Sequence, residues 1–257
     1  MSEELVVKDR DGVRLIIMNR PAKRNALNTD LTRALLNALE GADDDEAVGA
    51  VVLTGAGQSF CAGADLAEFK DLVPAKAHMV EARARLTANL HGIFSLMKKP
   101  VITAINGAAM GGGAGLALAG DMAVMAESAK LGYPEVTHGV VAAIVMTNLV
   151  RQLGRKAAFE LVALGQPIVS LRALELGMVN RVVRDADVVK EAVVIAVKLA
   201  ATSRPAMALT KRLFHQVAEL PFDEALEKGR EANERMRAFP LSATAAARGR
   251  GPGKGHQ

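Results

Sequence analysis

The run of glycines between residues 106 and 116 constrains the fold of this chain more than any other feature. It reads Asn-Gly-Ala-Ala-Met-Gly-Gly-Gly-Ala-Gly-Leu, and it lies between an apolar run at 101–105 and an Ala/Leu run that ends at Gly120-Asp121. This order predicts a buried strand, a glycine turn and the start of a helix. Glycine lets a ligand approach the backbone, and N–H groups at a helix start have no helical partner. The segment is therefore typical of a site that binds an anion or a developing oxyanion.

Close packing and a membrane span are two other interpretations of this segment. It lacks the spacing of dinucleotide-binding and phosphate-binding glycine loops, and a glycine cluster by itself more often serves close packing than a site. Residues 101–126 are apolar enough to suggest a membrane span. Asn106, Asp121 and the glycines argue against it, because polar groups are costly at membrane depth. We therefore expect a buried core segment and no membrane association.

Length and composition predict one large domain, or one domain with a helical appendage, and no metal site. Of the 257 residues, 50% are hydrophobic but only 3% are aromatic, so the core must consist of small and aliphatic side chains. The net charge of +4 is compatible with an anionic ligand. One cysteine, Cys61, cannot form an internal disulfide, and no secretory signal is visible, which favours a cytoplasmic location. No Cys/His cluster has metal-ligand spacing.

Apolar periodicity predicts an α/β region followed by a mostly helical one. Strands are expected at 5–8, 13–18, 50–54, 101–105, 122–126, 130–133 and 179–183. Helices are expected from Asn28 or Thr29 onward and at 76–97, 144–152, 155–164, 170–176, 187–202, 205–218 and 222–238. The acidic run at 43–46 is expected to be a solvated loop. Residues 241–257 are rich in Ala, Gly, Arg and Pro, which predicts a disordered tail and leaves nucleic-acid binding as a weak alternative.

Four segments, taken in order, resemble the crotonase (enoyl-CoA hydratase/isomerase) superfamily. They are RPAKRNAL at 20–27, FCAGADL at 60–66, the glycine segment through Asp121, and YPEV at 133–136 with Gly139 after it. The resemblance covers about residues 5–240. It implies an α/β fold in which ββα units form a spiral over 1–200, followed by a helical trimerisation region at 201–240. The expected assembly is a homotrimer or a dimer of trimers.

The resemblance also implies an acyl-CoA thioester substrate, with coenzyme A as part of that substrate and no separate cofactor. By residue match, the thioester oxygen accepts hydrogen bonds from the backbone N–H groups of Ala62 and Gly112. Glu135 matches the glutamate that transfers a proton at the carbon α to the thioester, and burial beside an apolar acyl chain should raise its pKa. The residues expected to bind the substrate are Lys23, Ala62, Gly63, Ala64, Asp65, Leu66, Gly111 and Gly112. Lys23 and Arg24 are candidates for contacts with the CoA phosphates.

Gly115 departs from the pattern of hydratase-type members, which carry a second glutamate at this position. Hydration places a water oxygen on the β carbon, and two carboxylates hold that water well. A single carboxylate can instead move a proton between the α and γ carbons and so shift a double bond. The sequence therefore slightly favours isomerisation, and hydration with another water-positioning group stays open. His138, Tyr133 and Glu127 are candidates for that group.

Two further functions stay open. Residues 110–116 also resemble 3-hydroxyisobutyryl-CoA hydrolases, but those proteins carry Pro-Asp where this chain has Ala142-Ala143. A CoA-binding protein without catalysis is compatible with the missing carboxylate. Asp121 is expected to be structural, and no membrane or nucleic-acid partner is expected.

Overall fold

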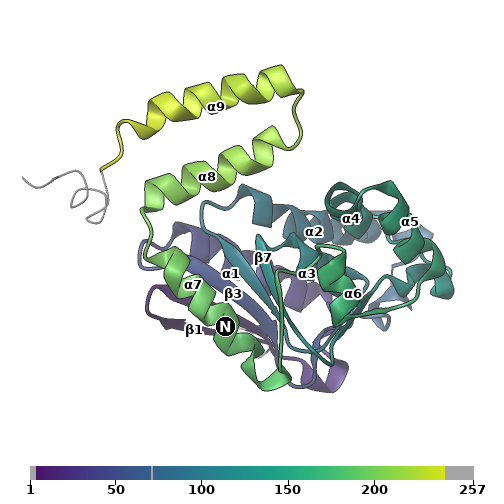
Figure 1. The fold of residues 1–257 in the computed structure, drawn as a ribbon. Coiled ribbons are helices and arrows are strands. Elements are labelled where there is room, and N and C mark those ends of the chain that lie inside the picture. The colour runs from purple at the N-terminus through teal and green to yellow at the C-terminus, as the bar shows by residue number, and fades with distance from the viewer. Residues whose placement is uncertain (1–3, 71, 241–257) are drawn as a thin grey trace, which may run out of the picture.

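The computed structural model describes residues 4–70 and 72–240, and in this part of the chain the strands form two sheets (Figure 1). The six-stranded sheet contains, in spatial order, β1 (Leu5–Arg10), β2 (Val13–Met18), β3 (Ala50–Gly55), β5 (Val101–Ile105), β7 (Met122–Ala126) and β10 (Arg181–Val183). The four-stranded sheet contains β4 (Ser59–Cys61), β6 (Ala108–Met110), β8 (Lys130–Gly132) and β9 (Ile168–Val169). All neighbours pair in parallel except β1 with β2 and β8 with β9.

Helices cover the sheets and complete a repeating pattern of strand, strand and helix. They are α1 (Thr29–Asp44), α2 (Ala77–Leu96), α3 (Gly112–Ala119), α4 (Val145–Leu153), α5 (Arg155–Leu164), α6 (Ser170–Glu175), α7 (Val188–Ala200), α8 (Arg204–Val217) and α9 (Phe222–Met236). The pairs β3–β4 and β5–β6 each place one strand in each sheet, and a helix, α2 or α3, follows each pair. The α/β class and the ββα spiral expected from the sequence are confirmed.

The central strands β3 and β5 are buried along their whole length, as expected for parallel strands with helices on both sides. At the sheet edge, the hairpin between β1 and β2 turns at Asp11-Gly12, where both φ angles are positive (53° and 75°). Asn28 begins α1, because its side-chain Oδ1 accepts a hydrogen bond from Leu31 N at 2.8 Å.

Two expectations from the sequence were incomplete or wrong. The strands β4, β6 and β9 were missed because runs of two or three residues are too short to show a period of two. The acidic run at 43–46 is not simply a solvated loop, since α1 extends through Asp44. Asp43 Oδ1 accepts hydrogen bonds from Lys98 N at 2.8 Å and Lys99 N at 3.2 Å, and so satisfies backbone groups after α2.

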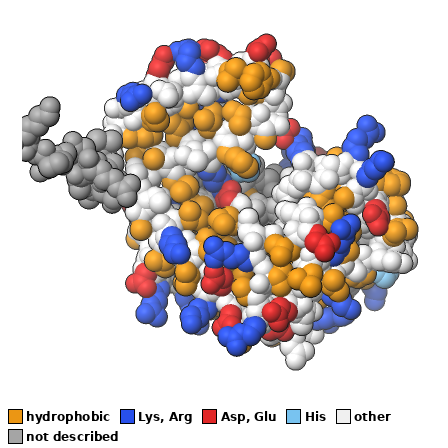
Figure 2. All heavy atoms as spheres, in the orientation of Figure 1, with side chains coloured by type: hydrophobic (Ala, Val, Ile, Leu, Met, Phe, Trp, Pro, Cys, Tyr) orange, Lys and Arg blue, Asp and Glu red, His pale blue; other side chains and the backbone are white. Residues whose placement is uncertain are grey.

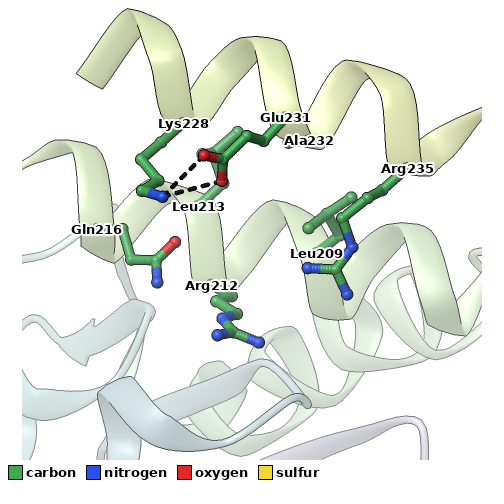
Figure 3. A pocket seen from close by; sticks show the side chains of 8 residues that line it. All are labelled: Leu209, Arg212, Leu213, Gln216, Lys228, Glu231, Ala232 and Arg235. Atoms are coloured by element: carbon green, nitrogen blue, oxygen red, sulfur yellow. Dashed lines mark hydrogen bonds and ion pairs between the residues drawn. The ribbon is translucent and has the colours of Figure 1, made fainter. Parts of the chain in front are cut away.

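The helices α8 and α9 form a hairpin that projects from the body of the protein (Figure 1). Lys211 Nζ fastens α8 to the body, because it donates to Asp121 Oδ2 at 2.7 Å and to Lys99 O at 2.8 Å. A small cavity of about 90 Å³ lies between the two helices, where Lys228 pairs with Glu231 (Figure 3). Figure 2 shows hydrophobic side chains exposed over this hairpin. The predicted tail at 241–257 lies outside the described residues.

In the described part of the chain, no single helix is both long and apolar enough to cross a membrane. The segments Asp185–Ala200 and Arg204–Val217 meet the length and composition criteria only as a pair, and they are bent by 110° relative to each other.

Candidate active site

A cavity of about 600 Å³ lies where the loops after β2, β4 and β6 meet the short 3-10 helix at Pro134–His138. Its walls are largely apolar and include Leu72, Val80, Val141 and Val145. Every residue that the sequence assigned to catalysis or substrate binding lines it, namely Lys23, Ala62, Gly63, Ala64, Asp65, Leu66, Gly111, Gly112 and Glu135. Tertiary folding therefore places the four sequence segments around one apolar space with a charged side chain at Glu135.

The buried amide of Asn25 fixes the loop after β2 against the loop around β4. Its Nδ2 donates to Ser59 O at 2.8 Å and to Ala56 O at 2.9 Å, and its Oδ1 accepts from Arg20 N at 2.9 Å. Both Arg24 and Asn25 have a positive φ (51° and 55°), a region that asparagine tolerates better than most residues. This local turn holds the first wall of the cavity in place.

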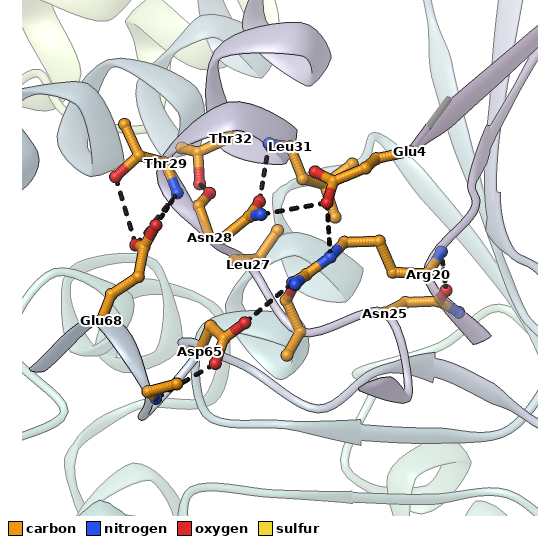
Figure 4. Close-up of polar contacts among 12 residues, drawn as sticks. Glu4, Arg20, Asn25, Leu27, Asn28, Thr29, Leu31, Thr32, Asp65 and Glu68 are labelled. Atoms are coloured by element: carbon orange, nitrogen blue, oxygen red, sulfur yellow. Dashed lines mark hydrogen bonds and ion pairs between the residues drawn. The ribbon is translucent and has the colours of Figure 1, made fainter. Parts of the chain in front are cut away.

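Asp65 is engaged in a polar network with the loop after β2 (Figure 4). Its Oδ2 pairs with Arg20 Nη1 at 3.0 Å, and Arg20 Nε pairs in turn with Glu4 Oε1 at 2.8 Å. Burial alone would raise the pKa of Asp65, but hydrogen bonds from Ala67 N and Arg20 outweigh it and hold the pKa below its usual range. The side chain of Asp65 therefore positions the loop, and it borders the cavity as an ion pair.

The backbone N–H of Ala62 is not available to a substrate, which corrects the donor that the sequence suggested. Ala62 N donates to Arg24 O at 2.9 Å, because the left-handed turn at Arg24 directs that carbonyl group at the end of β4. Leu27 pairs with the segment that follows β4. Leu27 N donates to Gly63 O at 2.7 Å, and Asp65 N donates to Leu27 O at 3.1 Å. In such a parallel bridge the N–H of the central residue, Ala64, points away from Leu27.

Ala64 and Gly112 instead bring two N–H groups without acceptors to the same place. Gly112 lies in the first turn of α3, where the helix supplies no acceptor, and no acceptor in the described chain takes either N–H group. A Cβ built on Gly112 would lie 3.8 Å from Ala64 N, so the two residues face each other. Gly63 keeps the space open, since a Cβ there would lie 2.7 Å from Met110 O and 3.2 Å from Gly112 N.

Substituting Gly63→Ala is expected to lower kcat/KM by roughly a hundredfold. The new Cβ has no room beside Met110 O, and φ at this residue is +88°, which alanine adopts poorly. Relief of the contact must move one of the two N–H groups, and loss of one such donor costs about 10²- to 10³-fold in rate. Steady-state kinetics on the thioester substrate that the family resemblance implies, with circular dichroism to check folding, would measure this. Unchanged kinetics in a folded variant would contradict the facing arrangement of Ala64 and Gly112.

Glu135 places its carboxylate against the start of α3. A Cβ built on Gly111 would lie only 2.9 Å from Glu135 Oε1, so the absence of a side chain there lets the carboxylate approach the backbone. Glu135 is half-buried, and its buried Oε2 has no hydrogen-bond partner among the described residues. Burial raises the pKa of Glu135, and only a backbone hydrogen bond and the nearby His138 oppose this shift. A carboxylate with these properties is suited to accept and return a proton.

The position beside Gly115 is already filled by two other residues. A Cβ there would lie 2.3 Å from Val145 Cγ1 and 2.8 Å from His91 Cε1. His91 belongs to α2 and is only 5% exposed, and neither of its ring nitrogens has a partner among the described residues. Burial, together with the charge of Arg83, lowers the pKa of His91 to about 4. His91 was not singled out from the sequence. A signal in the sequence could have found His91. This histidine follows Thr87 by four residues and Arg83 by eight, so the three side chains share one face of α2, and Thr87 and Arg83 line the cavity.

The buried neutral His91 should make stability depend on pH. In the unfolded chain it takes up a proton as the pH falls through about 6.5, whereas the folded protein resists until about 4. The free energy of unfolding therefore falls with decreasing pH in this window, by about 1.4 kcal/mol per unit. Urea unfolding near pH 7 and near pH 5 should show a loss about 2 kcal/mol larger in the wild type than in His91→Phe. A variant of the exposed His78 serves as the control. Equal losses of the free energy of unfolding in the wild type, in His91→Phe and in the His78 variant would contradict the burial of a neutral His91.

The remaining candidates from the sequence lie in different surroundings. His138 lines the cavity but is exposed, and Glu127 is exposed outside it. Tyr133 is fully buried behind Glu135, where burial and the nearby carboxylate raise the pKa of its phenol, and its hydroxyl has no partner among the described residues. Burial raises the pKa of Cys61 to about 12, which makes it a poor nucleophile. Asp121 is structural as expected, because its Oδ2 accepts from Val101 N at 2.7 Å.

No three His, Cys, Asp or Glu side chains within 4–70 and 72–240 are arranged to hold a metal ion.

Comparison with known proteins assigns this fold and site to a family. The enoyl-CoA hydratase/isomerase family model matches residues 8–251. A 2,3-dehydroadipyl-CoA hydratase of Escherichia coli is 36% identical over 89% of this chain and 88% of its own length. A short-chain-enoyl-CoA hydratase of Clostridium acetobutylicum is 34% identical over 88% of this chain and 87% of its own. The crystal structure of an enoyl-CoA hydratase of Mycobacterium smegmatis superposes with a TM-score of 0.90 at 29% identity, covering 98% of each chain.

The fold and these matches define an α/β enzyme of the crotonase superfamily that acts on acyl-CoA thioesters. Within that superfamily, the chain belongs to the enoyl-CoA hydratase/isomerase family.

Proposed function

We propose that this enzyme forms a thioester enolate from an enoyl-CoA and that Glu135 carries the proton to and from the α carbon. The observation that supports this most is the half-buried carboxylate of Glu135 beside Gly111, in the cavity that Ala64 and Gly112 also line. The N–H groups of Ala64 and Gly112 would donate to the thioester oxygen as negative charge grows on it. Each donor is fixed before the reaction by its loop or helix, so it stabilises the enolate without reorganisation.

The coenzyme A part of the substrate would lie across the loops at 20–28 and 61–68. Lys23 and Arg24 are exposed at the cavity, so they would meet the CoA phosphates. Leu66 is 58% exposed at the same rim and offers apolar surface to the adenine. The acyl chain would occupy the apolar part of the cavity between α2 and residues 140–145.

The proton transfer serves two reactions. Removal of an α proton and its return at the γ carbon moves a double bond between the 2- and 3-positions, and Glu135 alone is sufficient for it. The absence of a carboxylate at Gly115 favours this isomerisation slightly. The second candidate is hydration of a 2-enoyl-CoA, which is favoured by the hydratase names of the relatives. It requires a further group to hold water.

Assays of the purified protein with 3-enoyl-CoA and 2-enoyl-CoA substrates of several chain lengths would test the proposal. We expect turnover of at least one of the two, with the product identified by mass spectrometry and by the absorbance of the conjugated thioester. Tight acyl-CoA binding without turnover would favour a binding protein without catalysis. Release of free CoA would favour the hydrolase alternative.

We also propose that the chain assembles as a homotrimer or a dimer of trimers, through the helical region at 201–240. The α8–α9 hairpin exposes Phe214, Phe222 and Leu226, each more than half accessible to solvent (68%, 76% and 58%). Large exposed apolar side chains on a projecting hairpin are typical of an interface. Sedimentation would measure the number of subunits. A cytoplasmic location is proposed on the basis of the lone buried cysteine.

A further inference from the structure

His91 presents the least explained buried polar group near the candidate active site. A neutral imidazole carries one hydrogen-bond donor and one acceptor, and both ring nitrogens are buried without a partner among the described residues. Buried polar groups in native proteins are rarely left unsatisfied, and a ligand or bound water explains most such cases.

The ring of His91 directs its polar edge at α3. The atom closest to Gly115 is Cε1, which is bonded to both nitrogens, so Nδ1 and Nε2 lie on either side of this contact. Val145, which lines the cavity, lies against the same Cβ position of residue 115. Thr87 lies one turn before His91 on α2 and also lines the cavity. His91 is therefore next to the cavity wall, at the place where a side chain of residue 115 would begin.

Glu135 and His91 flank the same turn of α3. Glu135 contacts Gly111, and His91 contacts Gly115, whose N–H donates to Gly111 O at 2.9 Å. Glu135 and His91 therefore lie against two positions four residues apart at the start of α3, and each has a buried polar atom without a partner among the described residues.

We propose that His91 holds the oxygen atom that is water in the 2-enoyl-CoA complex and the 3-hydroxyl group in the product. The assignment rests on the proposed function and extends it, because it supplies the water-positioning group that hydration needs. The sequence suggested His138, Tyr133 and Glu127 for this role. His138 lines the cavity but is exposed, Tyr133 is fully buried, and Glu127 lies outside the cavity.

The reaction balances with Glu135 as the only group that gains and loses a proton. Water gives one hydrogen to the Glu135 carboxylate while its oxygen bonds to the β carbon, and the electron pair of the double bond moves to the thioester oxygen. The enolate then takes that proton from Glu135 at the α carbon. The second hydrogen of the water stays on the oxygen and donates to an imidazole nitrogen of His91 throughout. The low pKa of His91 fits a group that stays neutral during these steps.

Substitution of His91 separates the two reactions of the site. His91→Phe keeps the ring volume and removes both nitrogens, so we expect hydration of 2-enoyl-CoA to fall about 30-fold. Isomerisation of 3-enoyl-CoA uses no water and should stay within about twofold, which also shows that the variant is folded. His91→Asn returns an amide donor and acceptor and should recover part of the hydration rate. His78→Asn changes an exposed histidine of the same helix and should leave both rates unchanged.

The outcomes distinguish this assignment from the proposed function. A folded His91→Phe variant with an unchanged ratio of hydration to isomerisation would overturn the assignment alone, as would a wild-type enzyme that isomerises but does not hydrate. A wild-type protein that catalyses neither reaction would overturn the proposed function together with it. A purely structural His91 would alter stability in His91→Phe but not the ratio of the two rates.

Discussion

Glu135→Gln is expected to reduce kcat for both isomerisation and hydration by about a thousandfold, the largest effect on activity of any substitution considered for this enzyme. The amide has nearly the same shape as the carboxylate but cannot take a proton from the α carbon. The change corresponds to about 4 kcal/mol of barrier. Acyl-CoA binding should change little, because the proposed substrate-binding loops at 20–28 and 61–68 are untouched, so the loss should fall on kcat and leave KM nearly unchanged.

The stability of Glu135→Gln provides an independent check. The wild-type carboxylate is half-buried with one oxygen unpartnered, so replacing it by a neutral amide should leave the melting temperature unchanged or raise it. Glu127→Gln is the matched control, since it removes an exposed carboxylate outside the cavity and should keep full activity. If Glu135→Gln retained wild-type rates on both substrates, Glu135 would not be the acid/base.

Glu135 should also set the acidic limb of the pH profile of kcat/KM. In the proposed mechanism the reaction begins with the ionised carboxylate, so activity should fall as the pH decreases through the pKa of Glu135. Because burial raises that pKa above the ordinary glutamate value of 4.5, the decline of kcat/KM should begin at a higher pH than for an exposed glutamate. In Glu135→Gln the residual rate should lose this limb.

Gly115→Glu, which introduces the second carboxylate of hydratase-type members, is expected to destabilise the protein by about 4 kcal/mol and to leave hydration no faster. The place for the first side-chain atom is taken by Val145 Cγ1 at 2.3 Å and His91 Cε1 at 2.8 Å. A longer side chain would have to displace both residues, and its charge would enter a fully buried part of α3. Chemical denaturation of the variant would measure the loss.

Two alanine substitutions isolate the effect of packing at Gly115. Gly115→Ala should destabilise by about 2 kcal/mol, since even one methyl group has no room. Gly229 lies inside α9 with nothing within 4 Å of a built Cβ, so Gly229→Ala should stabilise by about 0.5–1 kcal/mol through helix propensity. Opposite signs for the two helical glycines are the expected result. A stabilising Gly115→Ala would mean that the space beside α3 is empty, and it would remove the argument for His91.

Much of the fold followed from local patterns. The strand β5 and the helix α5 have the predicted bounds, because apolar runs and turn residues fix them within a few neighbours along the chain. The order of the four motifs was sufficient to bring Glu135 and the glycine segment to one cavity, since each motif follows or precedes a core element. The short strands β4 and β6 of the second sheet were not predicted, because they pair with each other across about 50 residues of chain, as Ser59 does with Ala108.

The sequence by itself determined the family and the main elements and predicted Glu135 as the acid/base, because these depend on residue type and on spacing within a segment. Only the tertiary structure decided that Ala64, and not Ala62, has an N–H group without an acceptor, since the acceptor of Ala62 is the carbonyl of Arg24, far away in the chain. It also decided that the place beside Gly115 belongs to His91 and Val145. Hydrogen-bond pairing and steric occupancy are set by groups that meet only after folding, and no local pattern encodes them.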